Sequence, residues 1–301
     1  GGGGGGMNLR RRGIVVSFHS NMVTVEDEET GERILCKLRG KFRLQNLKIY
    51  VGDRVEYTPD ETGSGVIENV LHRKNLLTKP HVANVDQVIL VVTVKMPETS
   101  TYIIDKFLVL AEKNELETVM VINKMDLYDE DDLRKVRELE EIYSGLYPIV
   151  KTSAKTGMGI EELKEYLKGK ISTMAGLSGV GKSSLLNAIN PGLKLRVSEV
   201  SEKLQRGRHT TTTAQLLKFD FGGYVVDTPG FANLEINDIE PEELKHYFKE
   251  FGDKQCFFSD CNHVDEPECG VKEAVENGEI AESRYENYVK MFYELLGRRK
   301  K

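Results

Sequence analysis

The sequence predicts a multidomain protein with an N-terminal all-β barrel, a central α/β domain and a C-terminal α-helical domain. Residues 8 to about 75 contain short β-rich runs separated by turn residues such as "EETGE" and "DETGSG", a pattern typical of a small barrel. From "VDQVILVVTV" (85–94) onward, apolar strands alternate with helical patterns, which indicates a parallel sheet covered by helices. After about residue 237 the pattern becomes helical around a cysteine cluster.

The composition supports this organisation. The chain has 301 residues, 39% of them hydrophobic and 30% charged, which is typical of a globular protein of about two domains. Six glycines precede Met7, which we expect to be the natural start. No stretch approaches the roughly 18 apolar residues of a membrane span, so we expect a cytoplasmic protein. The net charge of -6 argues against a wholly basic nucleic-acid coat, although basic runs occur locally.

The predicted elements place the domains at residues 7–76, 77–236 and 237–301. In the central domain, "STYIIDKFLVLAEKN" has a capping serine and helical spacing, and "DEDDLRKVRELEEIYSG" has acids in its first turn. "ETVMVIN" and "KISTMAG" read as strands, and "AQLLKFDF" with "GYVVDTPG" as a hairpin. We expect helices in "PEELKHYFKEF", "VKEAVENGE" and "SRYENYVKMFYELLG" of the last domain.

A phosphate-binding motif lies past the middle of the chain, in "GLSGVGKSSLLNAI" (176–189). It matches G-x-x-x-x-G-K-[ST] between an expected strand (171–175) and an expected helix, which is the context that this motif requires. Its backbone N–H groups and helix N-terminus suit phosphate oxygens; Lys182 is expected to pair with the β and γ phosphates, and Ser183 to ligate magnesium. The expected nucleotide contacts here are Ser178, Gly179, Val180, Gly181, Lys182, Ser183 and Ser184.

A second motif, "DTPG" (227–230), ends an apolar strand. The Asp227 carboxylate at such a position holds magnesium through water, and the Gly230 N–H senses a γ phosphate. Alone this tetrapeptide is weak, but together with the phosphate loop it indicates a nucleoside triphosphate site.

Two further motifs select the base. In "NKMD" (123–126), Asp126 can accept hydrogen bonds from guanine N1 and the 2-amino group, which adenine cannot donate. Asn123 ties the loop together, and the Lys124 stem covers the base. In "SAK", which is Ser153, Ala154 and Lys155, a backbone N–H near Ala154 can meet guanine O6. The four motifs together select GTP over ATP.

The motif set resembles the signature of the translation-factor class of GTPases, but the order differs. In that class the phosphate loop comes first and the NKxD and SAK motifs last, whereas here NKMD and SAK precede the phosphate loop. Joining the old termini and reopening the chain elsewhere preserves the sheet, because chain ends commonly lie close together at a domain surface. We therefore expect a circularly permuted P-loop GTPase.

The polar segment "SEKLQRGRHTTTTAQ" (201–215) is expected to be a switch. By resemblance to bacterial GTPases with a "TTR"-like motif, we favour Thr211 over Thr210 as a magnesium ligand. Ras-like enzymes carry a water-orienting glutamine immediately after DxxG, where this chain has Phe231. Because an apolar side chain cannot orient water, His209 becomes the candidate for that role, beside Lys182 and Gly230 as catalytic residues.

Cysteine and histidine near the C-terminus indicate a metal site. Cys256, Cys261, His263 and Cys269 follow the pattern C-x4-C-x-H-x5-C, which suits one structural zinc ion without an open position for water. The alternative is a pocket of reduced cysteines without metal. Cys36 stands apart and is expected in the barrel core.

The barrel suggests an S1-like oligonucleotide-binding (OB) fold. Basic side chains on it are candidates for RNA phosphate contacts and one aromatic ring for base stacking: Lys37, Arg39, Lys41, Arg43 and Phe42. Small barrels also carry basic faces without binding RNA, so the barrel alone leaves both readings open.

The chain combines the barrel and the Cys3His segment with the sequences "NKMD", "SAK", "GLSGVGKSS", "GRHTTT", "DTPGF" and "CGVKEAVENGEIAESRYENYVKMF". This combination resembles the YjeQ/RsgA family of ribosome small-subunit-dependent GTPases. The resemblance implies GTP hydrolysis stimulated by the 30S subunit, a role in late 30S maturation, and contacts to 16S rRNA from the barrel and the zinc domain. We expect a monomer that binds GTP or GDP with Mg²⁺ and one structural Zn²⁺.

Two alternatives remain open. One is an RNA-binding assembly scaffold whose nucleotide site only regulates affinity; the other is a permuted GTPase of the large subunit, disfavoured by the order of barrel and zinc segment. We also expect the junction at 231–239 to couple the γ phosphate to RNA contact.

Overall fold

The computed structural model describes residues 9–40, 48–196 and 213–299. Five residues with predicted roles lie outside these ranges: Lys41, Phe42, Arg43, His209 and Thr211. The chain packs as two compact units. The first unit comprises Gly1–Asp86, Leu167–Thr173 and Leu193–Gly230, and the second comprises Gln87–Tyr166, Met174–Gly192 and Phe231–Lys301.

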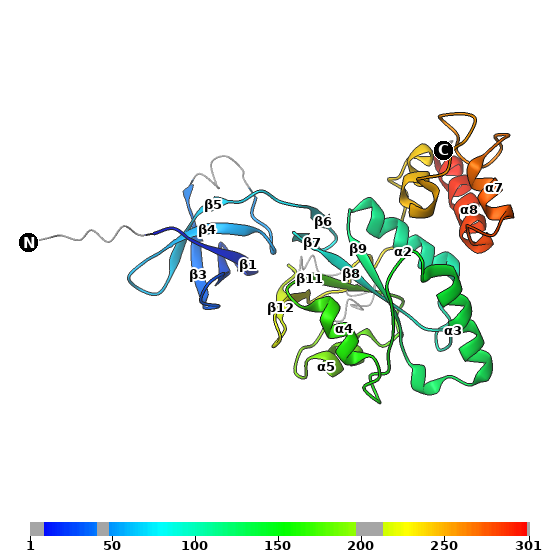
Figure 1. Ribbon diagram of the computed structural model, residues 1–301. Helices are drawn as coiled ribbons and strands as arrows, with labels where there is room; N and C mark the ends of the chain where they lie inside the picture. Colours follow the sequence, from blue (N-terminus) through cyan, green and yellow to red (C-terminus); the bar gives the residue numbers. More distant parts are fainter. Residues whose placement is uncertain (1–8, 41–47, 197–212, 300–301) are drawn as a thin grey trace, which may run out of the picture. The chain divides into compact units, whose positions relative to one another are not determined.

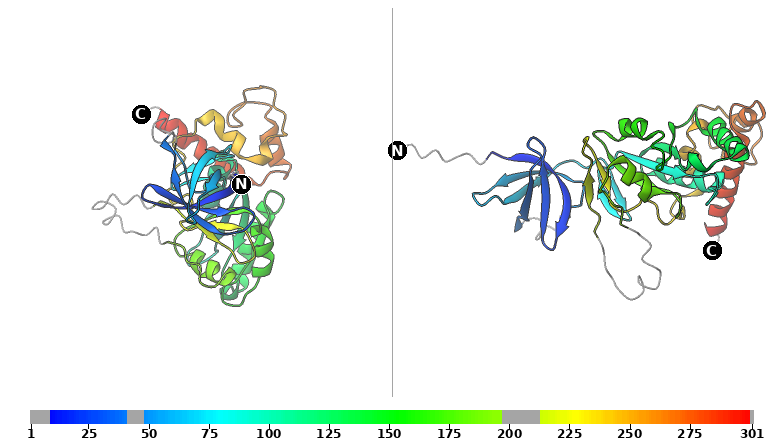
Figure 2. Two further views of the ribbon diagram at one scale, coloured as in Figure 1. Left: turned by 90° about the vertical axis from the view of Figure 1, so that its left-hand side faces the viewer. Right: turned by 90° about the horizontal axis from the view of Figure 1, so that it is seen from below.

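The first unit contains the predicted five-stranded barrel (Figure 1). Its strands are closed in the order β1-β2-β3-β5-β4, with β3 and β5 paired in parallel. Buried apolar side chains fill the interior, among them Val23, Val55, Tyr57 and the predicted core residue Cys36. The bounds are β1 Arg11–His19, β2 Met22–Asp27, β3 Arg33–Leu38, β4 Arg54–Pro59 and β5 Gly65–Val70. Figure 2 shows the strands curling into the closed barrel.

A short two-stranded sheet follows the barrel and was not predicted. It consists of β6 (Leu76–Thr78) and β7 (His81–Ala83), paired antiparallel. Strands of three residues are too short to show an alternating pattern in the sequence.

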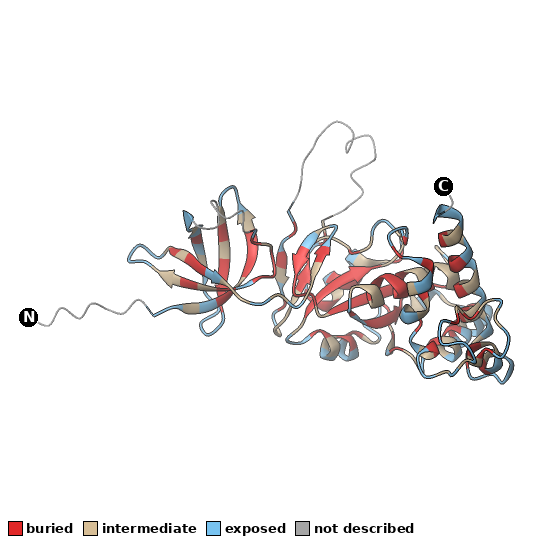
Figure 3. Cartoon of the chain, turned by 90° about the horizontal axis from the view of Figure 1, so that it is seen from above, coloured by how far each residue is buried: buried red, intermediate tan, exposed pale blue. Residues whose placement is uncertain are grey.

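The central α/β sheet has six strands in the order β10-β9-β8-β11-β13-β12. The pairs β8–β9, β9–β10 and β11–β13 are parallel, and β12–β13 form the predicted antiparallel hairpin. All six residues of β8 are buried, as expected for a parallel strand covered on both faces (Figure 3). The bounds are β8 Gln87–Val92, β9 Glu117–Ile122, β10 Ile149–Lys151, β11 Ile171–Ala175, β12 Leu216–Lys218 and β13 Tyr224–Val226.

Within the described ranges, α2 and α3 cover one side of the sheet, and α4 and α5 cover the other (Figure 1). The Ser100 side chain caps α2 by accepting from the Ile103 N–H, as predicted. Asp129 and Asp132 form a capping box at the start of α3. The bounds are α2 Thr101–Lys113, α3 Glu130–Tyr143, α4 Ile160–Leu167 and α5 Lys182–Ile189, with a 3-10 turn η1 at Met125–Leu127.

The C-terminal region is helical and packs on α2 within the second unit. Its elements are the 3-10 helices η2 (Pro241–Tyr247) and η3 (Lys249–Phe251) and the α-helices α7 (Gly270–Glu276) and α8 (Glu282–Arg299). One apolar cluster joins it to α2 through Val109 and Leu110. No helix in the described ranges is long and apolar enough to cross a bilayer.

The segment "PEELKHYFKEF" forms 3-10 turns in place of one continuous α-helix. Phe248, between η2 and η3, adopts an extended backbone conformation and is completely buried. Its ring stacks on Phe251 and meets the edge of Tyr288, with centroid distances of 5.1 and 5.2 Å. Tertiary packing of this ring therefore outweighs the local helical pattern.

Candidate functional site

The phosphate loop connects β11 to α5 and depends on two glycines. Gly176 and Gly181 have φ values of 144° and 93°, in the region that side chains disfavour. A Cβ at Gly176 would lie 2.4 Å from the Val91 carbonyl oxygen, and one at Gly181 would lie 2.6 Å from Asn123 Nδ2. Any larger residue would therefore push the loop away from its neighbours.

The loop presents its backbone at the N-terminus of α5. Four of its residues are exposed, namely Ser178, Gly179, Ser183 and Ser184. Val180 is buried and anchors the loop in the core. Lys182 Nζ donates to the carbonyl oxygens of Gly176 and Leu177 at 2.6 and 3.0 Å. Exposed loop residues, a helix N-terminus and a lysine at one place suit the oxygens of a polyphosphate.

The NKMD motif is tied directly to this loop. Asn123 Nδ2 donates to the Val180 carbonyl at 3.0 Å, and Thr152 Oγ1 donates to Asn123 Oδ1 at 2.9 Å. Lys124 Nζ donates to the Gly179 carbonyl at 2.6 Å. Two motifs more than fifty positions apart in the sequence thus form one contact surface, with buried Asn123 at its centre.

The SAK motif completes the predicted base-reading group. Ser153 is buried, and its Oγ donates to Asp126 Oδ1 at 2.8 Å, which orients the exposed Asp126 carboxylate. The Ser153 Oγ also accepts the Thr156 N–H at 3.1 Å. Ala154 is half-buried and Lys155 exposed next to it. The structure therefore brings the NKMD, SAK and phosphate-loop residues together in the second unit.

Asp227, the predicted magnesium ligand, belongs to the first unit and directly follows β13. Its buried carboxylate accepts from Arg196 Nε at 2.6 Å and from the Gln215 N–H at 2.9 Å. A carboxylate has about four lone-pair sites, so capacity remains for a water-mediated metal contact. Arg196 was not predicted, since one arginine in a loop carries no recognisable sequence signal.

The residues after Asp227 are tightly packed. A Cβ at Gly230 would lie 2.7 Å from Thr173 Oγ1, so this position has no room for a side chain. Phe231 follows with φ 56° and packs, half-buried, against the apolar cluster of the C-terminal region. Its ring is therefore engaged in packing.

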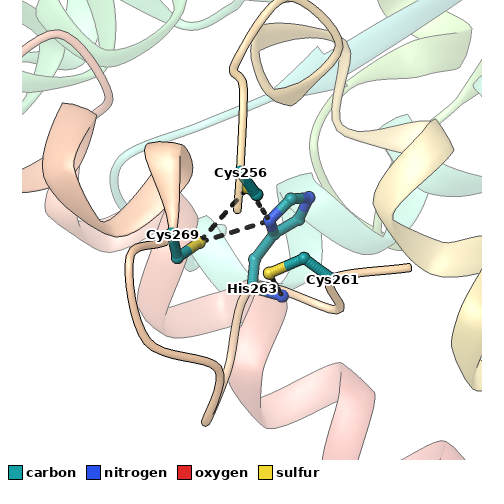
Figure 4. Close-up of side chains that lie close together, drawn as sticks. All are labelled: Cys256, Cys261, His263 and Cys269. Carbon is teal, nitrogen blue, oxygen red and sulfur yellow. Dashed lines mark hydrogen bonds between the residues drawn. The ribbon is translucent and has the colours of Figure 1, made fainter. Parts of the chain in front are cut away.

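The four predicted zinc ligands converge in the C-terminal region (Figure 4). Their donor atoms all lie within 4.8 Å of one another. The Sγ atoms of Cys256 and Cys269 are 3.8 Å apart, and His263 Nδ1 is 3.4 and 3.3 Å from them. A zinc tetrahedron with bonds of about 2.3 Å to sulfur has edges of about 3.8 Å, so these spacings fit the ion.

The surroundings also suit thiolate and imidazole ligands. The Gly270 N–H points to Cys256 Sγ and the His263 N–H to Cys261 Sγ, each at 3.3 Å. Burial lowers the pKa of His263 to about 4, which keeps the imidazole neutral and able to coordinate. The Cys3His cluster is therefore compatible with a structural zinc ion.

Basic side chains lie on the barrel and in the C-terminal region of the described ranges. Lys37 is exposed on β3, and Arg39 is exposed but pairs with the buried Glu68 at 2.7 Å. A cavity of about 460 Å³ beside the Cys3His cluster was not predicted. Its lining includes Lys245, His246, Lys249, Lys254 and Phe258 and contains no acidic side chain.

Comparisons with known proteins agree with these features. A family model described as RsgA GTPase matches residues 70–237, and one described as RsgA N-terminal domain matches residues 12–67. The small ribosomal subunit biogenesis GTPase RsgA of Thermotoga petrophila is 97% identical over 295 residues, which cover 98% of this chain and 100% of the relative. The protein of the same name from Carboxydothermus hydrogenoformans is 46% identical and covers 94% of this chain and 97% of its own length.

Two of the similar solved structures match nearly the whole chain. The crystal structure of YjeQ from Thermotoga maritima has a TM-score of 0.90 and 96% identity, with 96% of this chain and 99% of that chain covered. YloQ, described as a circularly permuted GTPase, has a TM-score of 0.84 and 35% identity, with 98% of each chain covered. The predicted fold class and the permuted motif order are confirmed.

Proposed function

Because this chain belongs to the RsgA family of small ribosomal subunit biogenesis GTPases, we propose that it couples GTP hydrolysis to late maturation of the 30S subunit. The chain is a GTP hydrolase by this membership. The observation that carries the proposal is the direct tie between the NKMD motif and the phosphate loop, through Asn123–Val180 and Lys124–Gly179. It is a guanine nucleotide site assembled in permuted order.

Different residues contact the base and the phosphates of the nucleotide. Asp126, oriented by Ser153, accepts from guanine N1 and the 2-amino group; the Lys124 stem covers the base, and Ala154 N–H and Lys155 complete the pocket. The phosphates lie on the backbone of residues 178–184, and Lys182 stabilises the β and γ phosphates. The phosphate loop binds any nucleoside triphosphate, and guanine is selected because Asp126 and the SAK motif contact the base.

Ser183, Thr211 and Asp227 would hold Mg²⁺, which when bound neutralises charge on the phosphates. The Gly230 N–H senses the γ phosphate, and His209 orients the attacking water in place of the glutamine of Ras-like enzymes. Phe231, whose ring packs against the apolar cluster, leaves that role open. The spacing and backbone N–H contacts of the Cys3His cluster support one zinc ion with a structural role.

We place RNA contacts on two surfaces. On the barrel they involve Lys37, Arg39, Lys41, Phe42 and Arg43, with Arg39 exchanging Glu68 for a phosphate. In the C-terminal region the acid-free cavity lined by Lys245, Lys249 and Lys254 suits the phosphate backbone of 16S rRNA. We propose that the protein works as a monomer in the cytoplasm, where these partners are found.

Sedimentation with ribosomal subunits tests the partner. The protein loaded with a non-hydrolysable GTP analogue should sediment with 30S subunits, and the GDP form should bind about tenfold more weakly. Preferential binding to 50S subunits would contradict the proposal. A scaffold with a purely regulatory nucleotide site is the second candidate, favoured by the basic cavity alone, and it predicts that 30S subunits leave turnover unchanged.

A further inference from the structure

The loop between β8 and α2, residues 93–99, has no role in the proposed function, yet it is closed by its own contacts. The Thr99 N–H donates to the Thr93 carbonyl at 2.8 Å, and the Thr93 N–H donates to Thr99 Oγ1 at 3.3 Å. Thr93 Oγ1 donates to the Pro97 carbonyl. Thr93 is completely buried, so these bonds form a fixed platform at the end of β8.

Tyr128 connects this platform to the base-reading NKMD motif. Its hydroxyl donates to the Asn123 carbonyl and accepts the Val94 N–H at 3.2 Å. Burial raises the pKa of Tyr128 to about 12, so the hydroxyl stays protonated and keeps both bonds at neutral pH. One hydroxyl therefore satisfies two backbone groups from different loops.

A second connection runs through Lys124. Its Nζ donates to the Met96 carbonyl at 2.7 Å as well as to Gly179. Lys124 and Met96 have φ values of 66° and 49°, in a region that costs about 1 kcal/mol or more for a residue with a side chain. Both residues keep these conformations because the surrounding bonds hold them, a situation common at functional sites.

An ion pair secures the other side of the loop. Lys95 Nζ lies 2.6 Å from Asp132 Oδ2, in the first turn of α3. The hydrogen bond from Lys95 is the main reason that the pKa of Asp132 is lowered, so this carboxylate stays ionised and available for the contact. The 93–99 loop is thus bonded to α3, to Tyr128 and to Lys124 of the NKMD motif.

We propose that the 93–99 loop and Tyr128 are positioning elements for guanine recognition, which hold Asn123 and Lys124 so that Asp126 meets the base. This inference rests on the proposed nucleotide site and adds residues to it. The Tyr128 hydroxyl acts through Asn123, and the Met96 carbonyl acts through Lys124. Neither element needs to touch the nucleotide.

Loss of the Tyr128 hydroxyl should be visible as weaker base recognition. Without it the Val94 N–H and the Asn123 carbonyl lose a partner, and the NKMD motif samples conformations that cannot bind. A binding-competent fraction of about one third weakens GDP and inosine diphosphate alike by about threefold. Looser alignment of Asp126 within the complex weakens GDP by about threefold more, because only guanine offers it the 2-amino group.

The experiment compares the binding of GDP and of inosine diphosphate, which lacks the 2-amino group, to the full chain. Tyr128→Phe should weaken GDP binding about tenfold and reduce the preference for GDP over inosine diphosphate about threefold. Tyr147→Phe is the matched control, since its buried ring has a hydroxyl that donates to Glu112 at 3.0 Å, away from the motif. It should keep both values within about twofold of the unsubstituted protein.

Unchanged GDP affinity or unchanged preference in Tyr128→Phe would overturn the inference. If that variant does not fold, Thr93→Val carries the same expectations, because it removes only the hydroxyl bond to Pro97. If the unsubstituted protein itself binds no GDP, the proposed function fails and not only the role of Tyr128.

Discussion

The Arg284 guanidinium donates to the Asp105 carboxylate at 2.9 Å, and both side chains are completely buried. Arg284 also bonds Glu250 in η3 at 2.6 and 2.7 Å, and Asp105 accepts from Tyr143 at the end of α3 at 2.7 Å. One cation thus joins α8 and η3 to helices α2 and α3 within the second unit. Burying these charges is favourable only while each keeps its partner.

Removing that cation should strongly destabilise the second unit. Arg284→Met leaves the buried Asp105 and the half-buried Glu250 without a counter-charge, and we expect the free energy of unfolding to fall by about 3–5 kcal/mol. Urea denaturation measures it. Arg134→Met is the control, since Arg134 pairs with Asp131 at the exposed surface, and it should change stability by less than about 0.5 kcal/mol. Equal effects of the two substitutions would contradict the role given to Arg284.

Zinc removal should unfold the C-terminal region first. Metal analysis should find one zinc per chain, and a strong chelator should lower the melting temperature by about 10 °C, because three of the four ligands are buried within this small region. Cys269→Ser should lose the zinc. Cys36→Ala, in the barrel core, should keep it. A single cooperative unfolding transition at the same melting temperature with and without metal would exclude a structural role for zinc.

The barrel should lose stability in acid through Asp27. A hydrogen bond from the Arg11 guanidinium, 2.8 Å away, is the main reason that the pKa of this carboxyl is lowered. The Tyr57 hydroxyl and two backbone N–H groups also donate to it. Because the folded pKa lies below the unfolded value of about 3.9, the stabilisation is present above pH 4 and lost as the pH falls further. The difference in unfolding free energy between the unsubstituted protein and Asp27→Asn should therefore stay constant from pH 6 to about pH 4.5 and narrow progressively from there to pH 3. A difference that stays constant down to pH 3 would contradict this.

The bound nucleotide should change hydrogen exchange in only one part of the junction at 231–239. Ile236 and Ile239 are buried in the apolar cluster, and Lys113 binds the Asp238 carbonyl and carboxylate at 3.2 and 3.0 Å. Phe231, next to the proposed γ-phosphate sensor, is only half-buried against the same cluster, so this end of the segment is less enclosed. Hydrogen exchange should slow at 231–235 with a GTP analogue and stay slow at 236–239 in both states. Identical exchange with GDP and the analogue would count against coupling through this segment.

The sequence predicted those features in which side-chain chemistry recurs at fixed spacing. The phosphate loop, NKMD and the Cys3His cluster are local patterns. In the structure Asn123 contacts the phosphate loop, Asp126 contacts Ser153, and Cys269 lies in the Cys3His cluster. Arg284–Asp105 and Tyr128–Val94 join segments whose distance in the sequence carries no pattern, so only the fold reveals them. The 3-10 turns around Phe248 were missed because burial of one ring outweighs helical propensity.

The central claim is that this permuted site hydrolyses GTP in response to the small ribosomal subunit. The most direct measurement is phosphate release from GTP at increasing 30S concentration, with Lys182→Ala and 50S subunits as controls. We predict a saturable rise of at least about tenfold with 30S subunits, and no rise with 50S subunits or in Lys182→Ala. A rate that does not respond to 30S subunits, while GTP still binds, would contradict the account and favour a scaffold.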